Sequence, residues 1–113
     1  MTREIRMEKP GDEAAIDRVN CAAFESMAEA HIISGMRRYY PGFDPRYSLT
    51  AWDDDECVGH VLFTPARMRF MGRTVSALTL GPIAVSPSAQ KSGIGGELIQ
   101  RGHDLGRQEG YAF

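Results

Sequence analysis

The residues best suited to chemistry form one glycine-rich run, Gln90-Lys91-Ser92-Gly93-Ile94-Gly95-Gly96. Residues 77–85 before this run have the apolar composition of a strand, and residues 94–109 after it have helical spacing. Glycines at a helix entry leave backbone N–H groups uncovered, and the helix N-terminus adds roughly half a positive charge. The run therefore predicts a site for a phosphate or pyrophosphate, with a plain tight turn between strand and helix as the alternative.

The flanking residues make this pattern more specific. The segment Leu80-Gly81-Pro82-Ile83-Ala84-Val85-Ser86-Pro87, followed by Gln90-x-x-Gly93-x-Gly95, closely resembles the acetyl-CoA-binding core of the GNAT family of N-acetyltransferases. In that family the motif reads Gln or Arg, two residues, Gly, one residue, Gly or Ala, and it follows a bulged strand and a Pro-containing turn. The resemblance implies a GNAT fold, acetyl-CoA as co-substrate, and acetyl transfer to an amine of a small molecule or peptide.

The same resemblance assigns parts of acetyl-CoA to particular residues. It implies that Ile83, Ala84 and Val85 contact the pantetheine arm, and that a backbone N–H near Ile83 polarises the thioester carbonyl. Such a donor is worth about 3–4 kcal/mol of transition-state stabilisation in other enzymes. The pyrophosphate is expected on the glycine-rich run, which consists of Gln90, Lys91, Ser92, Gly93, Ile94, Gly95 and Gly96.

The general base and acid are harder to place. Many GNAT members carry a carboxylate on the strand before the loop, but residues 77–81 contain none. His60, on the neighbouring expected strand, is the best local candidate for the general base. The alternative is that His60 is a packing residue with satisfied hydrogen bonds, as histidines in strands usually are. The frequent general acid of the family, a tyrosine after the fifth strand, would lie beyond Phe113, and Tyr111 does not match that position.

Apolar spacing and turn residues predict the elements that position these groups. Asp12 is placed to cap the first helix, and Gly110 suits the residue just after the last one. Gly102 and Gly106 would allow the last helix to approach the sheet closely. The expected strands cover residues 2–7, 49–52, 57–68 and 74–85, and the expected helices cover residues 13–24, 27–38 and 93–109.

Two details concern the strands. Pro65 and Pro82 fall inside strands and are expected at a bulge or where no ladder bond is donated. Residues 111–113 read as the start of one more strand, and the rest of the GNAT pattern would lie beyond them. The fold class expected is therefore α/β (α+β layered), a single domain over residues 1–113 with a mixed, mostly antiparallel sheet flanked by helices and C-terminally incomplete.

An open sheet edge beside residues 77–85 would expose unpaired backbone groups and apolar surface. This predicts a homo-oligomer in which another copy covers the edge, with residues 111–113 and the last helix near the contact. A second hypothesis is a non-catalytic acyl-CoA-binding or dimerisation module. A nucleotide-binding P-loop is disfavoured, because Lys91-Ser92 precedes the glycine instead of following it.

Composition narrows the remaining possibilities. The 113 residues are 42% hydrophobic and 25% charged, which is ordinary for a soluble domain, and a net charge of −2 gives no bulk attraction to nucleic acid or anionic membranes. The longest apolar runs are far shorter than a membrane helix requires, and Cys21 and Cys57 are expected to be reduced thiols of a cytoplasmic protein. The two cysteines and three histidines have no ligand spacing, so no metal site is expected.

Overall fold

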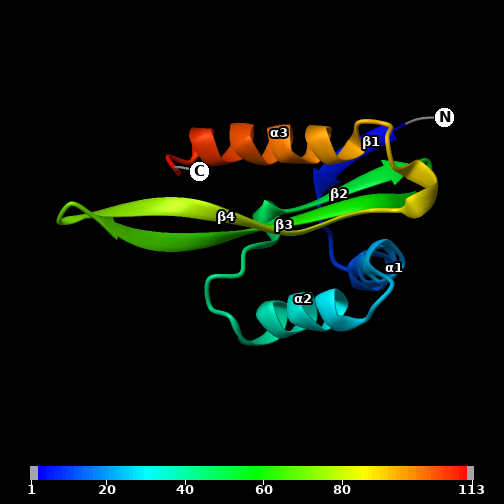
Figure 1. The fold of residues 1–113 in the computed structure, drawn as a ribbon, viewed down its shortest axis with the longest axis horizontal. Helices are drawn as coiled ribbons and strands as arrows, with labels where there is room; N and C mark the ends of the chain where they lie inside the picture. Colours follow the sequence, from blue (N-terminus) through cyan, green and yellow to red (C-terminus); the bar gives the residue numbers. More distant parts are fainter. Residues whose placement is uncertain (1–2, 112–113) are drawn as a thin grey trace.

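The computed structural model describes residues 3–111, which form one antiparallel sheet between two layers of helices (Figure 1). Helices α1 and α2 lie on one face of the sheet, and α3 lies on the other. The strands follow chain order across the sheet: β1 (Arg3–Met7), β2 (Ser48–Asp53), β3 (Glu56–Phe70) and β4 (Arg73–Val85). The helices are α1 (Glu13–Phe24), α2 (Ala28–Tyr39) and α3 (Ile94–Gln108).

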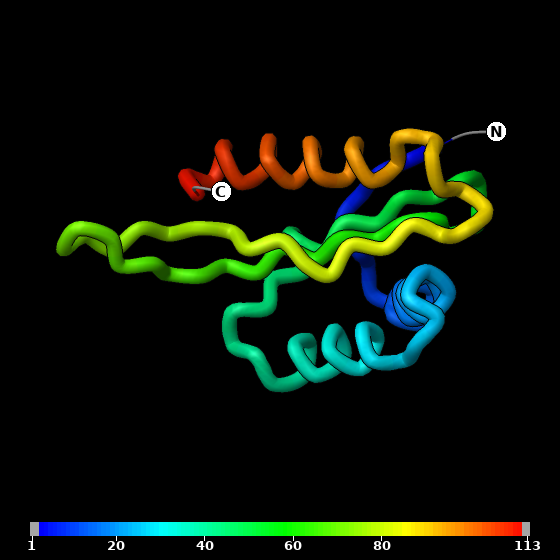
Figure 2. Tube along the Cα trace, viewed as in Figure 1, coloured from blue at the N-terminus to red at the C-terminus, as the bar shows by residue number. Residues whose placement is uncertain are grey.

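The β3–β4 hairpin extends well beyond the body of the molecule (Figure 2). Its arm accounts for the elongated shape, with extents of 47 × 27 × 24 Å. The turn at its tip has positive φ at both central residues, 50° at Met71 and 75° at Gly72. This is the signature of a two-residue turn whose twist matches that of the paired strands.

Each sheet face has its own apolar core. On the α3 face Phe63, Leu98 and Ile94 are almost fully buried, together with Tyr47, Leu49, Val58 and Val61. On the other face Ile16 of α1 and Ile33 of α2 pack with Leu62 of β3. Because Leu62 and Phe63 are adjacent, they show the alternation of strand side chains between the two faces.

The close approach expected at Gly102 is confirmed. A Cβ atom at this position would lie 2.1 Å from the ring of Phe63, so α3 can rest on the sheet only with glycine there. The end of α3 also follows its prediction, because Gly110 has φ of 82° and the Tyr111 N–H donates to Gly106 O at 2.8 Å. Together with the bond from the Gly110 N–H to Arg107 O, this forms a Schellman cap.

The sequence-based element boundaries agree with the structure to within about two residues, but one cap was wrong. Asp12 occupies the N-cap position of α1 without a side-chain capping bond. Its carboxylate accepts instead from the Lys9 N–H at 2.8 Å and from the Arg6 guanidinium at 2.7 Å. The nearby arginine on β1 therefore competes successfully for the oxygen atoms that the helix N–H groups would have used.

Both strand prolines avoid a ladder bond, as expected. Pro82 lies in a β-bulge, where β4 has one more residue than β3 between the paired positions. Pro65 pairs with Leu78, and its carbonyl accepts from the Tyr40 hydroxyl outside the ladder. The missing N–H of Pro65 would also have faced away from β4, so the ladder loses nothing.

The layered α/β architecture is confirmed, and all strand pairs among residues 3–111 are antiparallel. The parallel pairing of a mixed sheet would require the strand expected over residues 111–113, whose last two residues lie outside the described part of the chain. Tyr111 itself is not in a strand, and its ring packs edge-on against Tyr47 with centroids 5.6 Å apart.

Replacing Gly102 by alanine should destabilise the fold by about 1–3 kcal/mol, because the new methyl group must displace the Phe63 ring from a packed core. Urea unfolding measures the change. The matched control is Gly35→Ala in α2, where a Cβ meets no atom within 4 Å and helix propensity should slightly increase stability. Equal stabilities of the two variants would show that α3 does not depend on this contact.

Candidate functional site

The outer edge of β4 presents backbone groups near the end of the strand. The Ser86 N–H donates to Val58 O at 2.8 Å, and hydrogen-bonded pairs alternate along an antiparallel ladder. Ala84 therefore bonds to His60 of β3, whereas Ile83 and Val85 point their N–H and C=O groups away from β3. Within residues 3–111 no strand pairs with this outer edge.

A bulge separates this segment from the rest of β4. The ladder joins Val61 to Ile83 and then Phe63 to Leu80, so β4 has one extra residue in between. Gly81 at the bulge has φ of 141°, a conformation that residues with a Cβ rarely adopt. The bulged strand expected from the sequence is therefore present, directly before the outward-facing Ile83.

The start of α3 offers a second set of donors. Gly93 is the N-cap with φ of 86°, and the first intrahelical bond runs from the Glu97 N–H to Gly93 O. The N–H groups of Ile94, Gly95 and Gly96 precede that bond, and no side chain of the described residues caps them. The helix dipole places partial positive charge at this end, which suits an anion.

The two sets of donors belong to one surface. A Cβ at Gly95 would lie 3.8 Å from Val85 Cγ2 and 4.0 Å from Ile83 Cδ1. The first turn of α3 therefore lies against the side chains of the two residues whose backbone faces outward from β4. An extended ligand could contact the strand edge with its middle part and the helix N-terminus with an anionic end.

The loop between them is ordered by its own side chains. Gln90 Nε2 donates to Val85 O at 3.2 Å, and the Ser92 hydroxyl donates to Ala89 O. Lys91 is exposed and has φ of 66°. A ligand amide that bonds to the outward carbonyl of Val85 must either share this acceptor with Gln90 Nε2 or displace it.

His60 lies on the face of the sheet that α1 and α2 cover, opposite to α3, and none of its surface is exposed. Its Nδ1 is 3.2 Å from Asn20 Nδ2 of α1, and its Nε2 is 2.9 Å from the Ser48 hydroxyl of β2. Asn20 Nδ2 also donates to Ile16 O at 2.9 Å, which identifies it as the amide nitrogen. Nδ1 is therefore the acceptor, and Nε2 carries the proton.

Burial lowers the pKa of His60 to about 3, and the positive charge of Arg37 contributes in the same direction. A general base must reach the acceptor amine directly or through one water. Both ring nitrogens of His60 are bonded to other side chains, which favours the packing role over the base. Base catalysis by His60 stays a hypothesis.

Sequence reasoning missed the partners of His60. Ser48 is buried and donates on to Glu8, and Glu8 also accepts from Arg37 at 2.8 Å. One signal was available: Asn20 stands one helical turn after Ile16, on the apolar face of α1, where asparagine is a poor helix residue. The spatial meeting of β1, β2, α1 and α2 around His60 had no signal in sequence spacing.

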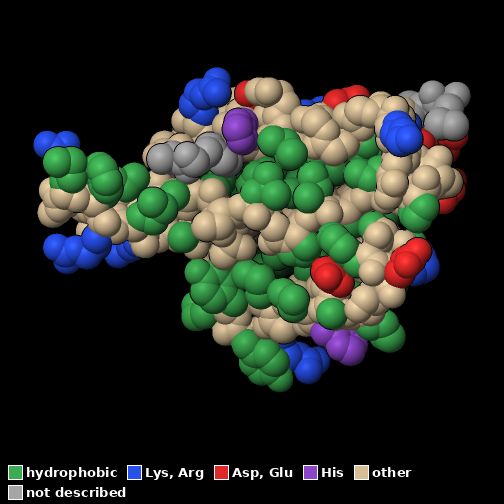
Figure 3. All heavy atoms as spheres, viewed as in Figure 1, with side chains coloured by type: hydrophobic (Ala, Val, Ile, Leu, Met, Phe, Trp, Pro, Cys, Tyr) green, Lys and Arg blue, Asp and Glu red, His purple; other side chains and the backbone are tan. Residues whose placement is uncertain are grey.

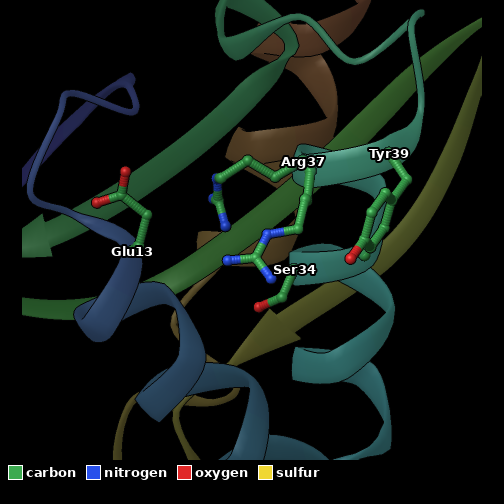
Figure 4. A pocket seen from close by; sticks show the side chains of 6 residues that line it. Glu13, Ser34, Arg37 and Tyr39 are labelled. Atoms are coloured by element: carbon green, nitrogen blue, oxygen red, sulfur yellow. The ribbon is translucent and has the colours of Figure 1, made fainter.

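Several hollows lie on the surface of the described residues, and two of them bear on the predicted site. One of about 480 Å³, between the start of α1 and the end of α2, is lined by Glu13, Ser34 and Tyr39 with Gly35, Arg37 and Arg38 (Figure 4). The other hollow, of about 370 Å³, includes Gln90 and Ser92, and its wall carries one guanidinium, Arg3, and three carboxylates, Asp53, Asp54 and Glu56. These carboxylates disfavour a phosphate there and favour the Gly95 side of the loop.

Residues 3–111 contain no group of three or more His, Cys, Asp or Glu side chains placed to hold a metal ion. None of the helices in that range has the length and apolar character needed to cross a membrane.

Comparisons with known proteins agree with this geometry. Residues 4–113 match the sequence profile of the acetyltransferase (GNAT) domain. The chain belongs to the GNAT acetyltransferase family. An uncharacterized N-acetyltransferase of Escherichia coli K12, YhbS, is 30% identical over 108 residues, covering 96% of this chain and 62% of YhbS. This GNAT chain thus spans less than two thirds of that relative.

Solved structures show the same fold. A GNAT acetyltransferase from Brucella melitensis, in complex with acetyl-CoA, has a TM-score of 0.83 at 33% identity, covering 97% of this chain and 71% of that one. YhbS from Escherichia coli, in complex with CoA, also has a TM-score of 0.83, at 32% identity, covering 97% and 59% of the two chains. The GNAT fold expected from the glycine-rich motif is confirmed.

The state of His60 gives a pH prediction. An unfolded histidine titrates near pH 6.5, so between that pH and about 3 the unfolded chain binds a proton that the folded chain does not. Stability should therefore fall as the pH falls, by up to about 1.4 kcal/mol per pH unit from this group. Urea unfolding from about pH 7 to about pH 5 should show a steeper loss for the wild type than for His60→Gln. Parallel curves would contradict a buried neutral imidazole.

Proposed function

We propose that this GNAT chain takes part in acetyl-CoA-dependent transfer of an acetyl group to an amine of a small molecule or peptide. One observation carries the proposal: the outward backbone of Ile83 and Val85 lies beside the uncapped N-terminus of α3, with Gly95 between them. The two complexes of relatives with CoA and acetyl-CoA support the same ligand.

Coenzyme A suits this surface part by part. Its pantetheine arm has two amides, which match the outward N–H and C=O groups of Ile83 and Val85 in strand-like pairing. Its pyrophosphate matches the N–H groups of Ile94, Gly95 and Gly96 at the positive end of α3. Gln90, Lys91, Ser92 and Gly93 form the loop between the two, and Ala84 holds the strand to β3.

The chemistry requires no covalent intermediate on the protein. A neutral amine attacks the thioester carbon and forms the C–N bond, and the C–S bond breaks to release coenzyme A as the thiolate. The nitrogen loses one proton to give the amide, and this proton balances the thiolate as the thiol. The N–H of Ile83 would donate to the carbonyl oxygen as negative charge develops on it, in a position fixed by the bulge. No carboxylate stands on residues 77–81, so the acceptor must lose its proton to another group or to solvent.

The Gly95→Val substitution tests the cofactor site. A Cβ at Gly95 makes only ordinary contacts, with Val85 and Ile83. The two further methyl groups of valine would occupy the space beside the α3 N-terminus and obstruct the approach of the pyrophosphate. Isothermal titration with acetyl-CoA should show affinity at least about tenfold weaker than for the wild type, the loss expected when charge-assisted hydrogen bonds are broken.

The control for this titration is Gly35→Ala, which changes a helix glycine far from the proposed site. It should bind acetyl-CoA as the wild type does. If Gly95→Val binds equally well, the glycine-rich run is only a turn. If the wild type does not bind acetyl-CoA at all, the proposed function is wrong for this chain.

A second candidate is a non-catalytic acyl-CoA-binding module. It is favoured by the lack of a carboxylate on residues 77–81 and by the engagement of both His60 nitrogens. Acetyl-CoA turnover against a panel of amines separates the candidates, because binding without turnover supports the module. The His60→Gln variant in the same assay tests the base hypothesis, which unchanged rates between about pH 6 and pH 9 would reject.

We also propose a cytoplasmic location and a homo-oligomer. The free thiols of Cys21 and Cys57 suit a reducing compartment. Among residues 3–111, no strand pairs with the outer edge of β4 along the hairpin arm, residues 73–80, and the arm exposes Met68, Phe70 and Met71 (Figure 3). A second copy that pairs with this edge and covers the hairpin would satisfy both, within the 1,200–2,000 Å² of a standard interface, as an order of magnitude.

Light scattering at micromolar concentration should therefore give the mass of a dimer or larger assembly. Ser76→Pro should shift it to monomer, because alternation along the ladder places the Ser76 N–H on the outer edge, where its loss spares the bonds to β3. A wild-type monomer of normal thermal stability would show that the edge tolerates solvent and that no second copy is needed.

A further inference from the structure

One chain of hydrogen bonds inside the molecule is not used by the proposed chemistry. It starts at Asn20 of α1, passes through the imidazole of His60 and the hydroxyl of Ser48, and ends at the carboxylate of Glu8. Arg37 of α2 donates to the same carboxylate. Asn20, Ser48 and His60 have no exposed surface, and the Glu8 side chain is 6% exposed.

The hydrogen bonds of this network all run in the same direction. Asn20 donates to His60 Nδ1, Nε2–H donates to the Ser48 oxygen, and the Ser48 hydroxyl donates to Glu8. A carboxylate can only accept, and the Arg37 guanidinium balances its charge. Only the neutral Nε2–H tautomer of His60 gives each of these three bonds one donor and one acceptor, so the imidazole is fixed in protonation and orientation.

The position of His60 connects this hydrogen-bond network to the outer edge of β4. His60 is directly opposite Ala84, and alternation makes this a hydrogen-bonded pair. The bulge interrupts the ladder soon after the next pair, Val61 with Ile83. The backbone pair of His60 and Ala84 therefore has few neighbouring ladder hydrogen bonds on the bulge side. The hydrogen bonds of the His60 side chain to α1 and β2 stabilise this pair instead.

We propose that His60 is a positioning residue, which holds β3 against Ala84 and thereby fixes the outward backbone groups of Ile83 and Val85. The consequence for ligand binding rests on the proposed acyl-CoA function, whereas the fixing of the strand does not. Buried polar groups are costly compared with apolar side chains of similar size, and asparagine lowers helix propensity at position 20. The network thus contributes a defined geometry more than it contributes stability.

Native-state amide exchange measured by NMR tests the strand part of the inference. The reporter is the Ala84 N–H, and the internal control is the Thr79 N–H, which by the same alternation bonds to Thr64 beyond the bulge. His60→Leu removes both hydrogen bonds of the imidazole, and Ser48→Ala removes one. Each should accelerate exchange at Ala84 at least about tenfold more than at Thr79, because local opening exposes one cooperative segment.

Two matched variants should leave that ratio unchanged. His60→Gln keeps a neutral donor and acceptor, so it should rescue the protection of Ala84. Ile33→Val reduces packing in the cluster of α1, α2 and Leu62 without touching the network. Equal acceleration at Ala84 and Thr79 in all variants would overturn the proposal and leave His60 a contributor to global stability. If His60→Leu does not fold, Ser48→Ala decides the question by the same ratio.

Acetyl-CoA titration tests the consequence for ligand binding. The dissociation constant should rise about tenfold or more for His60→Leu and remain within about twofold for His60→Gln, because small displacements of a binding group are costly. Unchanged affinity in a folded His60→Leu would overturn this part. If the wild type does not bind acetyl-CoA but the exchange ratio changes as expected, the proposed function fails and the positioning role of His60 stands.

Discussion

The alternation of hydrogen bonds along the β3–β4 ladder is the constraint on which the proposed site depends. Because Ser86 bonds back to Val58, the next pairs are fixed in turn, and Ile83 and Val85 must face away from β3. The bulge at Gly81-Pro82 resets this alternation, so the same outward groups would not be presented by a regular strand of equal length. A one-residue change in register would turn the donors and acceptors of this edge inward.

The packing of α3 completes the surface. Gly102 allows the helix to rest on Phe63, and Ile94 and Leu98 fill the core beneath its first turns. A Cβ at Gly59 would come within 2.8 Å of Ile94, so a second glycine allows the close contact from the sheet side. These contacts set the height of the α3 N-terminus above the sheet and keep its free N–H groups beside the strand edge.

The two faces of the sheet have different contents. The α3 face carries the larger apolar cluster and the proposed cofactor surface, whereas the α1–α2 face contains a smaller apolar cluster and the polar network around His60. Ala84 links them, since its side chain points to the α1 face and its neighbours present backbone at the open edge. A change on the buried face can therefore alter the geometry of the exposed edge without any direct contact with a ligand.

The sequence by itself determined the order and approximate limits of the elements, the bulge near Pro82, and the glycine-rich helix entry, because each has a local signal in spacing or turn residues. Tertiary structure decided what local signals do not encode. Asp12 bonds to Arg6 instead of capping α1, and His60 is enclosed by side chains from α1 and β2. The His60 contacts join residues 12 and 40 positions apart, whereas the Asp12 contact spans six positions but joins β1 to the start of α1. In both cases burial and competing partners determine which hydrogen bond forms.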